Sequence, residues 1–307
     1  MSQGFTSPPK TTSTNVASSA LTDYDLWPFV CQGRMTLTSG TPVTTTDVSG
    51  AITDVYFTSY KGNRIALYNT TTNLWNHVEF TEKSLTLPAN ADANHDIWGY
   101  LSGGDLALDQ TAWASATARN VAIVLQDGVY VKDGAAQYRY LGTVRTTANA
   151  GQTEDSETKR FVWNYYNRVS RKLRKLEGTD SWTYATQTWR PANNNSANSF
   201  NIVCGVAEDT ITVNVSVMAT PSGANFVYSF TGIGVNSTTA VSDMTVESGA
   251  IQYVFLTNVV NYTETPRVGF STYYWLEAAA QGTISFYGDA GDTTIYHQSG
   301  IVGAFLM

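Results

Sequence analysis

Between residues 211 and 217, apolar and polar side chains alternate without exception. The apolar positions are Ile211, Val213, Val215 and Val217. Because successive side chains of a strand point to opposite faces of a sheet, this period of two predicts a strand with one buried and one wet face. Phe226, Tyr228 and Phe230 repeat the pattern and predict a second half-buried strand.

Turn signals separate short β-prone runs in the first half of the chain. Asp127-Gly128 stands between the apolar run 121–125 and Val129-Tyr130-Val131, and Asp133-Gly134 follows closely. Asp-Gly between two such runs predicts a hairpin, because both residues tolerate a positive φ. Short strands at close intervals are typical of a sandwich or a barrel.

These patterns predict an all-β protein that begins with an extended arm and continues into two antiparallel, jelly-roll-like sandwich domains. We place the arm at 1–32, the first β domain at 33–152, a basic and aromatic connector at 153–192 and the C-terminal domain at 193–307. Further strands are expected at Ile251–Leu256, Tyr273–Leu276 and Thr283–Tyr287. The apolar end, 301–307, is expected either as an inner strand or on an oligomer axis.

The first 32 residues are expected to act as a docking arm. Residues 2–20 are rich in Ser, Thr and Pro, and their few large apolar side chains cannot form a core. An anchor-like group of large side chains follows: Leu21, Tyr24, Leu26, Trp27 and Phe29. One interpretation is an arm that lies on a neighbouring protein, and the other is a free tail.

Residues 159–176 allow two interpretations. The apolar positions repeat at spacings of three and four, as in a coiled-coil helix: Val162, Tyr166, Val169, Leu173 and Leu176. However, the stretch 161–166 is dense in aromatic and β-branched residues, which favour strands. The pattern favours a strand and leaves a short helix open.

The same segment carries a basic cluster, which includes Arg168, Arg171, Lys172, Arg174 and Lys175. It predicts an electrostatic dock onto an acidic neighbouring protein or onto anionic glycans. The alternative is a solvated face balanced by nearby acidic residues such as Glu157.

Composition excludes several classes of protein. Charged residues make up 14% of the 307 residues, against roughly 25% in an average domain. Neutral polar groups are less costly to bury than charges, so such a surface suits contact with other subunits. The net charge of −7 argues against nucleic acid as a partner. No apolar run approaches the ~18 residues that cross a bilayer, so membrane insertion is not expected. Cys31 and Cys204 are expected to be free thiols, with a disulfide as the alternative.

No catalytic motif is present in the sequence. It contains no G-x-S-x-G, no P-loop, no H-E-x-x-H and no C-x-x-C, and its three histidines are scattered. Gly288-Asp289-Ala290-Gly291-Asp292 lacks the ligand spacing of a calcium loop and is expected to be a plain turn. We therefore expect neither an enzyme nor a bound metal or cofactor.

Three strings resemble a module of tailed-bacteriophage virion proteins. They are LTSGTPVTT at 37–45, LQDGV at 125–129 and RFVWNYYNRV at 160–169. The resemblance extends over most of 33–307 and is absent from the arm. It implies a structural, fibre-like protein of the virion surface without catalytic residues.

The expected function is therefore that of a surface fibre or capsid decoration protein, docked by its arm on other virion proteins. Low charge, the apolar C-terminus and the fibre-like resemblance together predict a homotrimer. The alternative is a tail-fibre adhesin that attaches to the host by recognising surface glycans through its C-terminal domain. Exposed aromatic residues stack on sugars, although most of those in a sandwich lie in its core.

Overall fold

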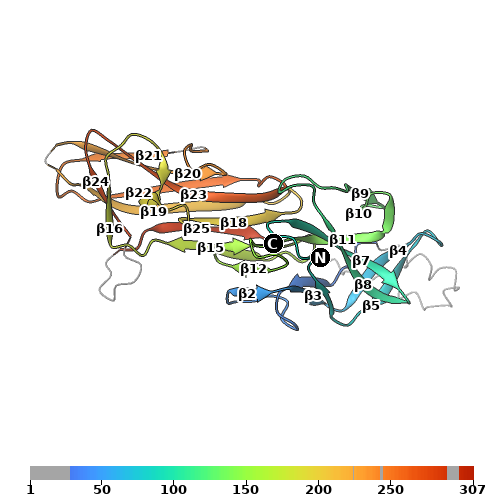
Figure 1. The fold of residues 1–307 in the computed structure, drawn as a ribbon. Coiled ribbons are helices and arrows are strands. Elements are labelled where there is room, and N and C mark those ends of the chain that lie inside the picture. The colour runs from blue at the N-terminus through green and yellow to red at the C-terminus, as the bar shows by residue number, and fades with distance from the viewer. Residues whose placement is uncertain (1–27, 224, 243–244, 289–296) are drawn as a thin grey trace, which may run out of the picture.

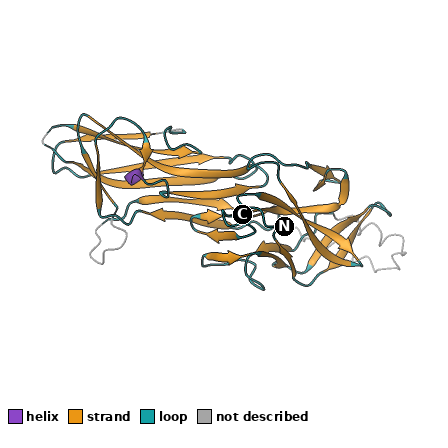
Figure 2. Ribbon diagram, viewed as in Figure 1, coloured by secondary structure: helices purple, strands orange, loops and turns teal. Residues whose placement is uncertain are grey.

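The computed structural model describes residues 28–223, 225–242, 245–288 and 297–307, and these residues form an all-β protein (Figure 2). The described parts contain no α-helix, and one short 3-10 turn lies at Ala192–Asn194. Every strand pair of the described residues is antiparallel except β13 (Lys159–Arg160) with β18 (Ser199–Cys204). The expected all-β class is confirmed. No helix of the described residues is long and apolar enough to traverse a lipid bilayer.

Three sheets make up the N-terminal half. The small ones contain β1 (Gly33–Thr36), β3 (Asp54–Ser59) and β6 (Lys83–Thr86), and β4 (Arg64–Asn69) with β5 (Leu74–Glu79). The six-stranded one contains β8 (Asp105–Ala112), β7 (Asn94–Ser102), β11 (Ala135–Arg145), β10 (Val129–Lys132), β9 (Ile123–Gln126) and β14 (Val162–Asn164). Asp127 and Gly128 both have positive φ, 51° and 82°, between β9 and β10, so the expected hairpin is confirmed.

Two larger sheets pack face to face in the C-terminal half (Figure 1). The first contains β2 (Val48–Ile52), β12 (Thr153–Ser156), β13 (Lys159–Arg160), β18 (Ser199–Cys204), β23 (Gly269–Ala280), β20 (Val227–Val235), β21 (Thr245–Ala250) and β17 (Arg190–Pro191). The second contains β15 (Ser170–Leu176), β25 (Gly300–Leu306), β19 (Ile211–Pro221), β24 (Ile284–Tyr287), β16 (Ser181–Tyr184) and β22 (Leu256–Glu264).

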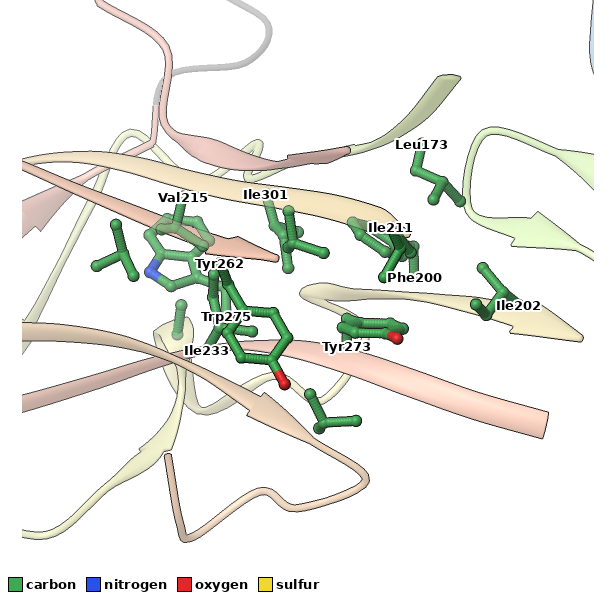
Figure 3. Close-up of a cluster of buried hydrophobic side chains, with 14 of the residues drawn as sticks. Leu173, Phe200, Ile202, Ile211, Val215, Ile233, Tyr262, Tyr273, Trp275 and Ile301 are labelled. Atoms are coloured by element: carbon green, nitrogen blue, oxygen red, sulfur yellow. The ribbon is translucent and has the colours of Figure 1, made fainter. Parts of the chain in front are cut away.

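The hydrophobic core of this sandwich lies between the two sheets (Figure 3). Val213 and Val215 of β19 point inward and are fully buried, as their alternation predicted. Trp275 of β23 faces them from the other sheet. The same cluster extends to Trp98 and Tyr140 of the N-terminal half, whose other buried apolar side chains form two further clusters.

The segment 153–192 contributes strands to both halves. β12 and β13 extend the first large sheet, β14 pairs with β11, and β15 pairs with β25 over its full length. Residues 170–176 are therefore a strand, and the helix alternative is wrong. The boundaries at 152 and 193 remain a prediction, although β2 of the first part pairs with β12.

The structure corrects one local expectation and confirms two others. Ile251–Leu256 is not a strand: β21 ends at Ala250, β22 begins at Leu256, and the residues between them form a turn. The segment 301–307 is confirmed as an inner strand, since β25 lies between β15 and β19. Cys31 and Cys204 are both free and buried.

A buried ion pair joins the two halves. Asp96 of β7 accepts hydrogen bonds from Arg119 Nε at 2.6 Å and from Thr143 Oγ1 at 2.8 Å. Arg119 Nη2 also donates to the carbonyl oxygen of Gly205, directly after β18, at 2.8 Å. Burial raises the pKa of Asp96, while the charge of Arg119 works in the opposite direction. This Asp96–Arg119–Gly205 link fixes the end of the six-stranded sheet to the sandwich.

Candidate functional site

The expected docking arm is described only at its root. Leu21, Tyr24, Leu26 and Trp27 lie outside the described residues. Phe29 is described, and its side chain is 66% exposed. We define residues 28–30 as the arm root, because here the chain enters the folded protein.

The arm root is held by the buried guanidinium of Arg139, on β11. Its Nη1 donates hydrogen bonds to the carbonyl oxygens of Pro28 at 2.7 Å, Val30 at 3.1 Å and Ala66 at 2.7 Å. The guanidinium carbon lies 4.5 Å from the centre of the Tyr166 ring. No ion pair of Arg139 is found among the described residues, so carbonyl oxygens and a π face stabilise its charge.

The hairpin formed by β9 and β10 packs against the arm root as well, and together with Arg139 it forms what we call the seat of the root. The ring of Phe29 lies against Gly128, where an added Cβ would stand 3.1 Å from the ring. Trp75 Nε1 donates to Asp127 Oδ2 at 3.0 Å and ties the hairpin turn to β5. Leu125, on the same hairpin, is 61% exposed. The LQDGV string thus forms part of the seat of the arm root.

The basic cluster is largely neutralised within the protein. Arg171 is buried and pairs with Asp155 at 2.9 Å. Arg168 pairs with Glu208 at 3.0 Å and with Asp209, and it lies over the rings of Trp163 and Tyr165. Both arginines therefore have structural partners.

The remaining three basic residues lie on the outer side or edge of β15. Lys172 and Arg174 both pair with Glu157, at 3.2 and 2.6 Å. Burial disfavours ionisation of Glu157, but the hydrogen bonds from Arg174 and Lys172 outweigh it and lower its pKa. Lys175 lines a shallow depression together with Lys159 and has no ion pair among the described residues. Contact of this cluster with a partner remains a prediction.

A row of aromatic rings lies on the outer face of the sandwich, along β20. Burial alternates in the first half of this strand, where Val227, Ser229 and Thr231 are buried and Tyr228 and Phe230 are half-buried, and every residue from Thr231 to Val235 is buried. Tyr228 and Phe230 point to the other face, and Phe226, 49% exposed, precedes them. The buried hydroxyls are satisfied because Asn258 Nδ2 donates to Ser229 Oγ at 2.9 Å and to Thr231 Oγ1 at 3.2 Å. The strand thus turns its hydroxyls inward and its aromatic rings outward.

Trp189 extends this row. Its ring centre lies 6.4 Å from that of Phe230 with the planes at 77°, and Phe230 lies 6.4 Å from Tyr228. Tyr228 lies 5.2 Å from Phe226. We call these four residues, Trp189, Phe230, Tyr228 and Phe226, the aromatic row.

A buried carboxyl group positions Trp189. Glu277, fully buried on β23, accepts hydrogen bonds from Trp182 Nε1 at 2.7 Å and from Arg190 Nε at 2.9 Å. Burial raises the pKa of Glu277 to about 7, against these donors. Arg190 follows Trp189 directly and pairs in register with Glu277. The indole therefore stands on a fixed backbone, where it lies against Gly232.

Sequence reasoning missed the orientation of this row. The alternation of Phe226, Tyr228 and Phe230 is visible in the sequence, but it suits a buried face equally well. The sequence offered one signal of the true orientation. The residues between the aromatic ones, Ser229 and Thr231, alternate in phase with Val227 and Ile233, so these four share a face that can also be the buried one. Among the described residues, no three His, Cys, Asp or Glu side chains gather as metal ligands.

Comparisons with known proteins show no family. No protein-family model matches the chain, and no curated protein does. Among solved structures, infectious bursal disease virus Gx strain matches at 11% identity and TM-score 0.25, over 89% of this chain and 74% of that one. BuGH86wt in complex with neoagarooctaose matches at 11% and 0.25, over 85% and 33%. A Bacillus thuringiensis Cry1Da tryptic core variant matches at 7% and 0.21, over 85% and 50%. The chain spans a third to a half of the latter two proteins, and TM-scores this low indicate no shared function.

Proposed function

We propose that this chain is a structural protein of a tailed-phage virion, a surface fibre or capsid decoration protein docked by residues 1–32. The observation that carries the proposal is the position of the arm root. Phe29 lies on the β9–β10 hairpin, at one end of an elongated molecule, and the sandwich extends to β16 and β24 at the other end (Figure 1). An attachment segment at one end and a projecting sandwich suit a surface appendage.

The construction of the root supports this role. Arg139, on β11, binds carbonyl oxygens of both the root and β4. A force applied to the arm is therefore carried by the six-stranded sheet and by the β4–β5 sheet rather than by one loop. The Val30 carbonyl of the root also accepts a hydrogen bond from Ala66 N at 2.8 Å, and Gln32 N, two residues farther along the chain, donates to the Arg64 carbonyl at 2.9 Å. A terminal segment without an attachment role would not need these hydrogen bonds to its root.

Removing residues 1–27 tests the docking role. This truncation leaves the root at Pro28–Val30 and its contacts with Arg139 intact, so the protein is expected to fold with an unchanged melting temperature. It is expected to be absent from purified particles assembled with it in place of the full-length chain. Incorporation at the full-length copy number, measured by quantitative mass spectrometry of particles, would contradict the proposal.

The proposal includes a homotrimer, which is supported by the outer face of the second large sheet. Among the described strand residues, the charges on this face are confined to the β15 edge, where Lys172 and Arg174 are paired with Glu157. The other outward positions are neutral or apolar, for example Thr212, Asn214, Ser216, Val259, Asn261, Val302 and Leu306. Neutral side chains are desolvated at less cost than charges when subunits pack.

Light scattering of the purified protein is expected to give a mass three times the 33.4 kDa of one chain. Substituting Val302 and Asn214 with lysine places like charges in the supposed interface and is expected to lower that mass towards one chain. A trimer that survives both substitutions would place the interface elsewhere, and a monomeric wild-type protein would refute the trimer.

A second candidate function is that of a host-binding adhesin whose C-terminal part recognises surface glycans. The aromatic row supports it, because large apolar rings on an outer sheet face mark an interaction site. The two functions are compatible, since an appendage docked at one end leaves the sandwich free to bind.

A further inference from the structure

We infer that the aromatic row binds a neutral, linear polysaccharide, with one pyranose ring seated in the corner between Trp189 and Phe230. The inference rests on the second proposed function and names its site and ligand class. It starts from the inverted strand β20, whose burial pattern places aromatic rings outside and hydroxyl groups inside.

The rings of the row are exposed in part: Phe226 is 49% exposed, and Trp189, Tyr228 and Phe230 are half-buried. Ala280 and Ala278 of β23 stand opposite Tyr228 and Phe230. On the other side Gly249 stands opposite Tyr228, and a Cβ there would come within 2.5 Å of the Phe226 ring. Small residues therefore flank Tyr228 on both sides, whereas Phe230 has Ala278 on one side and Glu247 on the other.

The corner between Trp189 and Phe230 has the size and chemistry of a sugar subsite. It is a depression of about 290 Å³ that is also lined by Gln187, Thr245 and Ala278. The two ring planes stand at 77°, so a pyranose that stacks its C–H face on one ring meets the edge of the other. The amide of Gln187 and the hydroxyl of Thr245 supply donors and acceptors for sugar hydroxyls. Aromatic faces combined with uncharged polar groups suit a carbohydrate better than an apolar side chain.

The row also predicts a chain rather than a single sugar. Consecutive ring centres are 6.4, 6.4 and 5.2 Å apart, close to the length of one sugar unit in an extended polysaccharide. Neighbouring ring planes are inclined at 77°, 35° and 75°, so sugar units beyond the corner meet ring edges as well as ring faces, and affinity is expected to rise from a disaccharide to a tetrasaccharide.

Charge selects a neutral ligand. The charged residue that strand pairing places beside the row is Glu247, opposite Phe230 and exposed. Lys172 and Arg174 lie on the other large sheet, where Glu157 holds them. A uronic-acid or sialylated chain would therefore be repelled at the row, whereas a neutral hexose chain would not.

The test measures binding of the full chain to defined oligosaccharides by titration calorimetry. The probes are di-, tetra- and hexasaccharides of glucose, galactose and mannose in their common linkages, with an oligouronate as the anionic counterpart. At least one neutral series is expected to bind, more tightly as a tetrasaccharide than as a disaccharide, and Trp189→Ala and Phe230→Ala are each expected to weaken it about tenfold. The matched control is Tyr253→Ala, which removes an aromatic ring that is 83% exposed and outside the row; it is expected to leave affinity unchanged.

Three results would overturn the inference. They are no binding of any neutral series, equal binding of the oligouronate, or affinity that survives Trp189→Ala and Phe230→Ala in protein of unchanged melting temperature. Adhesion is tested separately by binding of labelled protein to host cells. If both variants still bind host cells, the glycan site is refuted but the adhesin role is not. The docking role of the arm is tested separately, by particle incorporation of the truncated protein.

Discussion

Replacing Arg119 with methionine is expected to lower the free energy of unfolding by about 3–5 kcal/mol, because it leaves the Asp96 carboxylate buried without a counter-charge. The Asp96 side chain is 2% exposed, and Arg119 supplies its hydrogen bond at 2.6 Å. The same substitution removes the bond to the Gly205 carbonyl that links the six-stranded sheet to the sandwich. Chemical denaturation followed by tryptophan fluorescence measures the loss.

The loss is expected to depend on pH in a defined direction. Burial raises the pKa of Asp96 above its unfolded value, and without Arg119 the folded pKa rises further. A carboxyl group with a raised folded pKa stabilises the fold below its unfolded pKa, and this contribution is lost as the pH rises through the folded value. The deficit of Arg119→Met relative to wild type is therefore expected to be larger at pH 8 than at pH 5.

Two variants sharpen this experiment. Adding Asp96→Asn to Arg119→Met removes the unpaired charge and is expected to recover part of the stability and abolish the pH dependence of the deficit. Arg174→Met breaks a half-exposed pair with Glu157 and is expected to cost less than about 1 kcal/mol. An Arg119→Met deficit as small as that of Arg174→Met would show that the buried pair is not what joins the halves.

Replacing Arg139 with methionine is expected to release the arm root and to destabilise the fold by about 3 kcal/mol. Methionine retains much of the buried apolar volume but donates no hydrogen bond, so the carbonyls of Pro28 and Ala66 lose a charged donor. Hydrogen exchange is expected to accelerate at the amides of Gln32 and Ala66, which hold the root to β4. Particles assembled with this variant are expected to carry fewer copies.

Arg64→Met is the matched control for Arg139. Arg64 lies on β4, close to the same root, but its pair with Glu79 is exposed, so its loss is expected to change stability by less than about 0.5 kcal/mol. If Arg139→Met destabilises the fold without faster exchange at Gln32 and Ala66, the guanidinium supports the core rather than the arm root.

Local patterning in the sequence determined the class of fold and several elements. The alternation at 211–217 specified both the strand and its buried face, because the apolar β-branched side chains that share one face are stabilised by burial in a core. Asp127-Gly128 specified a hairpin, because few other pairs adopt two positive φ angles at low cost.

The tertiary structure alone decided what periodicity leaves open. Residues 170–176 could follow a helical or an extended path, and pairing with β25 over seven residues selects the strand. In β20 both faces carry a plausible period of two, and Asn258, from another strand, selects the inner one by satisfying Ser229 and Thr231.

The partners of the buried charges were equally invisible in the sequence. Arg139 meets Pro28 across 111 residues and Arg119 meets Gly205 across 86. Trp189, directly before β17, packs its ring against that of Phe230 on β20. A local pattern reports which backbone conformation a segment prefers, whereas these contacts depend on which distant segments fold against one another, and that is set by the packing of the whole sandwich.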